Sequence, residues 1–121
     1  MLSYNKVVGQ FGEKLACDYL NKNGYNLIAK NVQIGHLEID IIVKKIAKLT
    51  FVEVKTRTSK TYGEADEMIS RQKIKNLKKG IGLYLNTLNK ERYNDVSLDF
   101  ISIDIDKISK CAKIKHYKNI M

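Results

Sequence analysis

The chain has 121 residues, a length typical of one domain with its own hydrophobic core. Its 22 lysines and arginines outnumber 13 acidic residues, and the net charge of +9 favours a polyanionic partner, nucleic acid before an anionic membrane. No apolar run reaches the roughly 20 residues of a membrane span, and the N-terminus lacks the apolar core of a signal peptide. We therefore expect a cytoplasmic protein rather than a membrane-spanning one.

The sequence contains no boundary that would divide it into domains. Proline is absent, and no linker rich in glycine or serine interrupts the chain. Cys17 and Cys111 are far apart and match no zinc or redox spacing, so we expect free thiols. These features predict a single domain over residues 1–121, with a basic C-terminal extension from about residue 106.

The first predicted element is a helix from about residue 6 to residue 23, ended by Gly24. Glu13 lies at the edge of its apolar arc. Gly9 and Gly12 lie inside the arc, which predicts a close approach of this helix to a sheet. The large apolar residues of the arc are Val8, Phe11, Leu15, Tyr19 and Leu20.

The later elements predict an α/β fold in the order α-β-β-β-α-β, followed by a late edge strand. Ser70 is the expected N-cap of the second helix. The core-facing residues of that helix are Ile74, Leu77, Ile81, Tyr84, Leu85 and Leu88. The predicted elements are strands at 25–31, 37–45 and 49–59, a helix at 70–89, and strands at 95–105 and 111–119.

The third predicted strand, "LTFVEVKTRTS" at 49–59, combines apolar and ionised residues. Since side chains alternate faces along a strand, Glu53, Lys55 and Arg57 share one face. The strand carries apolar residues on both faces, a pattern typical of strands covered on both sides. Ionised groups in such a place are costly unless they are paired or bind a metal ion. This conflict directs the search for function to this strand.

The second and third strands are joined by a short loop at 45–48, which predicts an antiparallel hairpin. If Lys44 opposes Leu49, Asp40 lies opposite Glu53 and Glu38 lies opposite Lys55. A slip of one residue would instead turn Asp40 to the other face. Facing carboxylates repel each other. A divalent cation with a preference for oxygen ligands, Mg²⁺ or Mn²⁺, would replace this repulsion by attraction of both carboxylates to the ion.

Two acids and a lysine on one face are the minimal set for phosphodiester hydrolysis. In this interpretation Asp40 and Glu53 bind the ion, and Lys55 positions water and offsets developing negative charge. Glu38 is expected to support the site. The alternative is a solvated face of ordinary cross-strand ion pairs, of which Glu38–Lys55 would be one.

Basic residues surround the candidate acids. Arg57 can grip a phosphate with two hydrogen bonds, although an exposed arginine at a strand end is the alternative. The predicted nucleic-acid-binding residues on the second helix are Arg71, Lys73, Lys75, Lys78 and Lys79, of which Lys73 is expected to reach inward. The tail lysines, which extend this footprint or protect an edge strand from aggregation, are Lys107, Lys110, Lys113, Lys115 and Lys118.

Other polar residues receive more modest interpretations. Tyr62 and Gly63 indicate a turn close to the site or a plain loop. His116 has no acid at ligand spacing, which favours a surface or packed histidine. Asp99 is expected to be structural, paired with a helix lysine, with a role in shaping the site as the alternative.

Several runs resemble the YraN family of endonuclease-like proteins, which belongs to the PD-(D/E)XK nuclease superfamily with Holliday-junction resolvase-like relatives. The runs are "GQFGEKLACDYLNKNGY", "LEIDII", "FVEVKTR", "YGEA" and "LDFISI", in order and at compatible spacing. The resemblance covers roughly residues 9–105. Two residues depart from the family pattern: Leu37 replaces a usual glycine, and Leu98 replaces a usual basic residue.

The resemblance implies a restriction-endonuclease-like core, a mixed central sheet flanked by helices. It places Asp40, Glu53 and Lys55 at the positions that bear metal and catalysis, with Glu13 as a further metal-binding acid. It also implies a metal-dependent nuclease that acts on DNA or structured nucleic acid and that could act as a homodimer. The alternatives are a non-catalytic nucleic-acid-binding module with the same fold, and an interaction domain whose charge serves solubility.

Overall fold

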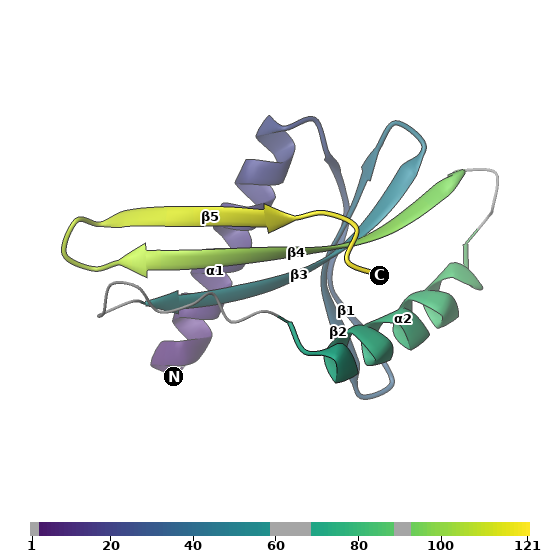
Figure 1. The fold of residues 1–121 in the computed structure, drawn as a ribbon, viewed down its shortest axis with the longest axis horizontal. Coiled ribbons are helices and arrows are strands. Elements are labelled where there is room, and N and C mark those ends of the chain that lie inside the picture. The colour runs from purple at the N-terminus through teal and green to yellow at the C-terminus, as the bar shows by residue number, and fades with distance from the viewer. Residues whose placement is uncertain (1–2, 59–68, 89–92) are drawn as a thin grey trace.

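The computed structural model describes residues 3–58, 69–88 and 93–121. Its described strands form one five-stranded mixed sheet in the order β1-β2-β3-β4-β5, flanked by two helices (Figure 1). The elements are α1 (Tyr4–Lys22), β1 (Asn26–Ile34), β2 (Leu37–Lys45), β3 (Lys48–Thr58), α2 (Arg71–Leu85), β4 (Asp95–Asp106) and β5 (Cys111–Tyr117). The predicted α/β class and the order α-β-β-β-α-β with a late strand are confirmed.

Helix α1 begins where Ser3 caps it, because the Ser3 hydroxyl accepts a hydrogen bond from the Lys6 amide at 3.2 Å. The chain leaves the helix through Gly24, whose φ of +88° favours glycine. Gly12 is buried against Thr56, and any side chain there would overlap that residue. The predicted close approach is therefore confirmed at Gly12 but wrong at Gly9, which faces open space.

Helix α2 begins at the predicted cap, where the Ser70 hydroxyl accepts from the Lys73 amide at 3.1 Å. It ends at Leu85, earlier than the predicted residue 89, because the backbone tightens into a turn in which the Thr87 amide donates to the Tyr84 carbonyl. Within the described residues, neither helix has the length and apolar character needed to cross a membrane.

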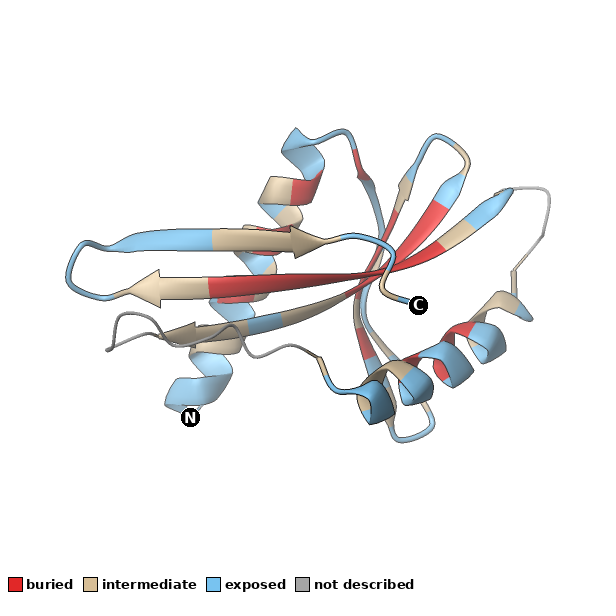
Figure 2. Ribbon diagram, in the orientation of Figure 1, coloured by how far each residue is buried: buried red, intermediate tan, exposed pale blue. Residues whose placement is uncertain are grey.

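The helices cover opposite faces of the sheet, which explains the two-sided apolar pattern of β3. Val52 packs with Ala16 and Leu20 in a core beneath α1. Phe51, one residue earlier, packs with Leu77 and Ile81 in a core beneath α2. Figure 2 shows the buried residues concentrated along the middle of the sheet and on the inner sides of the helices. Glu53 consequently belongs to the α2 side, the same side as Phe51.

The strands β2 and β3 pair only over part of their length, and this defines a fork. Their ladder runs from Lys45 opposite Lys48 to Ile41 opposite Val52, with Lys44 opposite Leu49 as predicted. Beyond Ile41, β2 continues beside β1, whereas β3 continues beside the parallel strand β4. Figure 1 shows the β1–β2 hairpin turning away from the other three strands. We call the point of separation the fork.

Candidate functional site

Asp40 and Glu53 are the first residues beyond the last ladder pair, so they lie at the fork. An Asp40 carboxylate oxygen accepts a hydrogen bond from the Val54 amide at 2.9 Å. This side-chain bond takes the place of the ladder bond that β2 would otherwise supply there. The predicted pairing of Lys44 with Leu49 is confirmed, and the two acids lie in contact. The predicted pairing of Glu38 with Lys55 is wrong, because the β2–β3 ladder ends at Ile41 and Glu38 pairs with Gln33 of β1.

The environment of Glu53 favours its neutral form. Burial raises the pKa of Glu53 from 4.5 to about 8, and the charge of Asp40 and a hydrogen bond to Asp40 act in the same direction. The nearby Lys73 ammonium opposes this shift. Near neutral pH, the environment therefore favours the protonated form of Glu53 more than an exposed glutamate would. A carboxyl pair of this kind is typical of sites poised to bind or react.

A second group of acids adjoins the fork, in which Glu13 of α1 meets Glu38 and Asp40 of β2. Their carboxylate oxygens lie within 4.8 Å of one another. With its amide nitrogen turned toward them, Asn31 donates to Glu13 at 2.9 Å and to Glu38 at 3.0 Å. Burial raises the pKa of Glu13, and the charges of Asp40 and Glu38 raise it further. Three carboxylate groups from two elements are the kind of oxygen ligand that hard divalent cations take.

Asn31 is a site residue that the sequence reasoning missed. It lies on β1 between Lys30 and Val32, which pair with Ile41 and Ile39, and so it stands beside Asp40. Its φ of 52° is in the left-handed region that asparagine tolerates better than most residues. An asparagine flanked by strand residues was the available signal, but it does not reveal which carboxylates lie nearby.

Two lysines lie near the acid pair on the α2 side. Lys73 reaches inward from α2 as expected, and its ammonium is 3.3 Å from a Glu53 carboxylate oxygen. The Lys73 side chain is 42% exposed and that of Glu53 is 15% exposed, so the ion pair lies at the edge of the core. Lys55 is exposed and lies two residues beyond Glu53, on the same face of β3.

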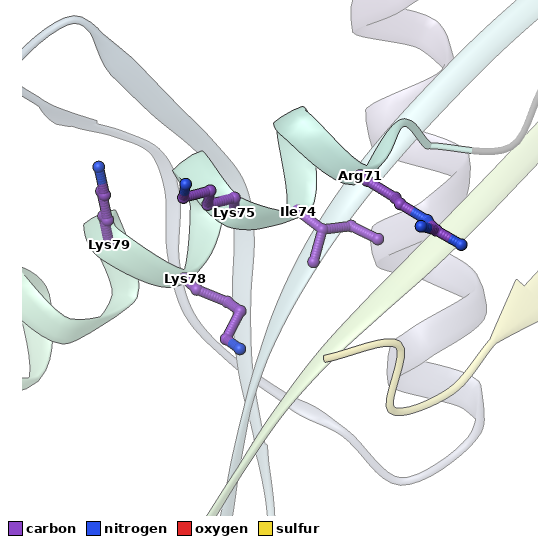
Figure 3. A pocket seen from close by; sticks show the side chains of 5 residues that line it. All are labelled: Arg71, Ile74, Lys75, Lys78 and Lys79. Carbon is purple, nitrogen blue, oxygen red and sulfur yellow. The ribbon is translucent and has the colours of Figure 1, made fainter.

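The basic face of α2 forms a groove with a volume of about 470 Å³. Figure 3 shows its side chains fanning out from the helix. The lining residues are Arg71, Ile74, Lys75, Lys78 and Lys79. Four of the five are cations that the sequence singled out, so these predicted nucleic-acid-binding residues share one surface, which we call the basic groove.

Arg57 does not line this groove and forms an ion pair within the sheet. Its guanidinium nitrogen is 2.7 Å from a carboxylate oxygen of Asp104, the residue directly beside it on β4. A phosphate at Arg57 would therefore have to share or replace Asp104. The predicted turn at Tyr62 and Gly63 lies outside the described residues.

The two departures from the family pattern occupy core positions. Leu98 is buried beneath α2, so a side chain at this position does not reach a phosphate at the surface. Leu37 packs against Gly80 of α2, where a side chain on the glycine would overlap it. Both leucines therefore contribute to the seating of α2 on the sheet.

Asp99 lies on the opposite side of the sheet and is paired with His116 rather than with a helix lysine, so that expectation was wrong. His116 donates to an Asp99 carboxylate oxygen at 2.7 Å, and their side chains are 5% and 3% exposed. The other ring nitrogen of His116 is 3.0 Å from the Tyr19 hydroxyl. Asp99 also accepts from Ser97 and from the Asn119 amide. This cluster is a packed structural element, as expected for Asp99.

Comparisons with known proteins place the chain in a family. The model of the uncharacterised protein family UPF0102 matches residues 12–105. A UPF0102 protein from Syntrophomonas wolfei is 36% identical over 115 residues, covering 95% of this chain and 97% of the relative. Another, from Clostridium botulinum strain Alaska E43, is 38% identical over 120 residues, covering 98% and 97%. The chain therefore belongs to the uncharacterised protein family UPF0102, which is the YraN family that its motifs resemble.

Proposed function

We propose that this chain is a metal-dependent nuclease that hydrolyses phosphodiester bonds in DNA or structured nucleic acid. The observation that carries the proposal is the contact of Asp40 with Glu53 at the fork, where the pKa of Glu53 is raised to about 8. Two carboxyl groups in contact at the edge of a core destabilise the sheet unless a ligand uses them. Family membership is consistent with this proposal and names no activity by itself.

In the proposed site, Asp40 and Glu53 would hold Mg²⁺ or Mn²⁺, with Glu13 and Glu38 as further oxygen donors. The bound ion would lower the pKa of a water molecule and stabilise charge on the phosphate. Lys55 would position the attacking water from the same face of β3. The cations of the basic groove would hold the phosphate backbone of the substrate.

The rival proposal is a non-catalytic module that binds nucleic acid through the same surface. It is supported by the basic groove, whose cations Arg71, Lys75, Lys78 and Lys79 do not depend on the acid pair. Such a module would bind in a strongly salt-dependent manner and leave the backbone intact.

The deciding experiment is a cleavage assay on linear duplex, single-stranded and branched DNA, with Mn²⁺, with Mg²⁺, and with a chelator. We expect cleavage that requires the ion and is abolished by Glu53→Gln. Lys55→Ala should lower the rate by about 10²-fold or more, the cost of removing one group that stabilises developing charge.

Matched controls remove the same kinds of charge elsewhere. Asp18→Asn changes an exposed acid on α1, and Lys48→Ala changes an exposed lysine at the start of β3. Both should cleave at the wild-type rate. Salt-sensitive binding by the wild type without cleavage of any substrate would refute the nuclease and support the module.

A further inference from the structure

A second hollow, of about 270 Å³, lies between α2 and the turn that joins β1 to β2. From the helix it is lined by Asn76, Lys79 and Leu83, whose spacing of three, four and seven residues puts them on one face. Gly80, on this same face, also lines the hollow. Leu37 of β2 occupies part of the space next to that glycine.

The walls of this hollow are apolar and its rim is polar. Ile34, Leu37 and Leu83 supply the apolar surface, and Leu83 is 60% exposed, a large fraction for an aliphatic side chain. His36 lies exposed at the β1–β2 turn and offers a flat ring at the rim. The Asn76 side-chain oxygen accepts a hydrogen bond from the Gln72 side-chain amide at 3.0 Å. The group that Asn76 can offer to a ligand is therefore its NH₂ group, which is a donor. An apolar slot with a flat ring and an amide suits a planar heterocycle.

The second hollow adjoins the basic groove, because Lys79 lines both. The ligand must therefore combine a run of negative charges with a planar apolar group. An acidic peptide supplies the charges but not the planar group. A nucleotide supplies both in one unit, since each phosphate is joined to one base.

We infer that the second hollow binds the base of an unpaired nucleotide, while Lys79 binds the adjoining phosphate. Bases in a duplex are paired and stacked, so a single-stranded segment places a base there without the cost of extruding it. The inference rests on the proposed binding of nucleic acid but not on hydrolysis. It narrows the substrate to nucleic acid with an unpaired segment along α2.

The test measures binding by fluorescence anisotropy at low salt, with a chelator present so that no strand is cut. The probes are a labelled oligothymidylate and an abasic strand of the same length, which keeps the phosphates and lacks the bases. We expect the wild type to bind the abasic strand about tenfold more weakly, the loss typical of one base stack.

Variants of the lining residues test whether the hollow causes the difference in affinity between the two strands. Leu83→Ser and His36→Ala should weaken binding of oligothymidylate and leave binding of the abasic strand unchanged. Lys79→Ala should weaken both strands, because it removes a phosphate contact. Ile108→Ser, which changes an apolar side chain that is 93% exposed at the β4–β5 turn, should change neither. Circular dichroism would verify that each variant is folded.

Several results would overturn the inference: equal affinity for both strands, an equal effect of Leu83→Ser on both, or displacement of oligothymidylate by polyglutamate as readily as by itself. The last result would assign the surface to an acidic protein. Cleavage with Mn²⁺ without base-dependent binding would overturn this inference alone. Base-dependent binding without cleavage would overturn the proposed hydrolysis alone.

Discussion

Glu53 at the fork and Asp99 beneath α1 are acids in neighbouring strands of one sheet, yet their pKa values shift in opposite directions. Burial raises the pKa of Asp99, but hydrogen bonds from His116, from the Asn119 amide and from Ser97 outweigh it, and the net pKa is lowered. Burial also raises the pKa of Glu53, and its neighbour Asp40 adds to the increase instead of opposing it.

The difference lies in the partners rather than in the depth of burial. Asp99 is surrounded by donors within the chain, so nothing further is needed to stabilise its charge. Glu53 meets another carboxyl group and a half-exposed lysine, so its charge is stabilised incompletely. A buried acid satisfied by its own fold is structural, whereas an acid opposed to another acid is available to a ligand.

The largest effect should come from Asp99→Ala. It leaves His116, Ser97 and the Asn119 amide without their acceptor, so we expect the free energy of unfolding to fall by about 3–5 kcal/mol. Urea denaturation measures the loss. Asp104→Ala, which breaks a more exposed ion pair with Arg57, should cost about 1 kcal/mol or less. A loss below that of the Asp104 variant would show that the Asp99 cluster does not support the fold.

The pH dependence of stability should come next in size. Between the ordinary pKa of 4.5 and about 8, the unfolded chain loses the Glu53 proton while the folded chain keeps it. The free energy of unfolding should therefore decrease as the pH rises across this interval, by about 2–4 kcal/mol. Glu53→Gln should remove this decrease and stabilise the fold at pH 8.

Asp99 should respond in the opposite sense, because its pKa is lowered in the folded state. Its contribution is present above its ordinary pKa of 3.8 and is lost as the pH falls through the folded value. Denaturation curves of the wild type and of Glu53→Gln over a range of pH separate the two. Parallel pH profiles for these two proteins would contradict the assigned pKa of Glu53.

Binding of Mn²⁺ should stabilise the fork by about 2–3 kcal/mol when the ion is at about a hundred times its dissociation constant. The stabilisation should grow from pH 6 to pH 8, since the Glu53 proton must leave before the ion binds. Thermal unfolding with and without the ion measures it. The effect should vanish in Asp40→Asn and persist in Asp18→Asn. Persistence in Asp40→Asn would locate the ion elsewhere.

The smallest effect should come from Lys73→Ala. Because its ammonium lowers the pKa of Glu53, its removal should raise that pKa above the wild-type value. The half-exposed pair itself should contribute under about 1 kcal/mol to stability. Carbon NMR titration of labelled glutamate measures the pKa, with Lys78→Ala on the same helix as the control. An unchanged pKa in Lys73→Ala would indicate that the ion pair does not form in solution.

Much of the fold was predictable because it follows local rules. A two-residue turn at Ile46 and Ala47 sets the parity of the β2–β3 hairpin, so Asp40 and Glu53 could be assigned to one side. Ser70 and the spacing of the apolar residues after it located α2. The direction of Lys73 followed from its position in the first turn of that helix.

The errors arose where distant segments meet. The pairing of His116 with Asp99 depends on the β4–β5 register, which brings together residues 17 positions apart in the chain. The place of Glu38 beside Glu13 depends on the packing of α1 and on the left-handed backbone of Asn31. Alternation of side chains places Glu38 on a face but does not name its neighbours.

Local periodicity and turn length were sufficient to predict the order of the elements and the set of charged residues on each face, because both depend on neighbours in the chain. Tertiary packing decided the surroundings of the acidic residues. It set the residue at which β2 leaves β3, the approach of Glu13 from α1, and the depth at which Glu53 lies. A pKa depends on burial and on charges brought from elsewhere in the chain, so the availability of this acid pair appears only in the folded protein.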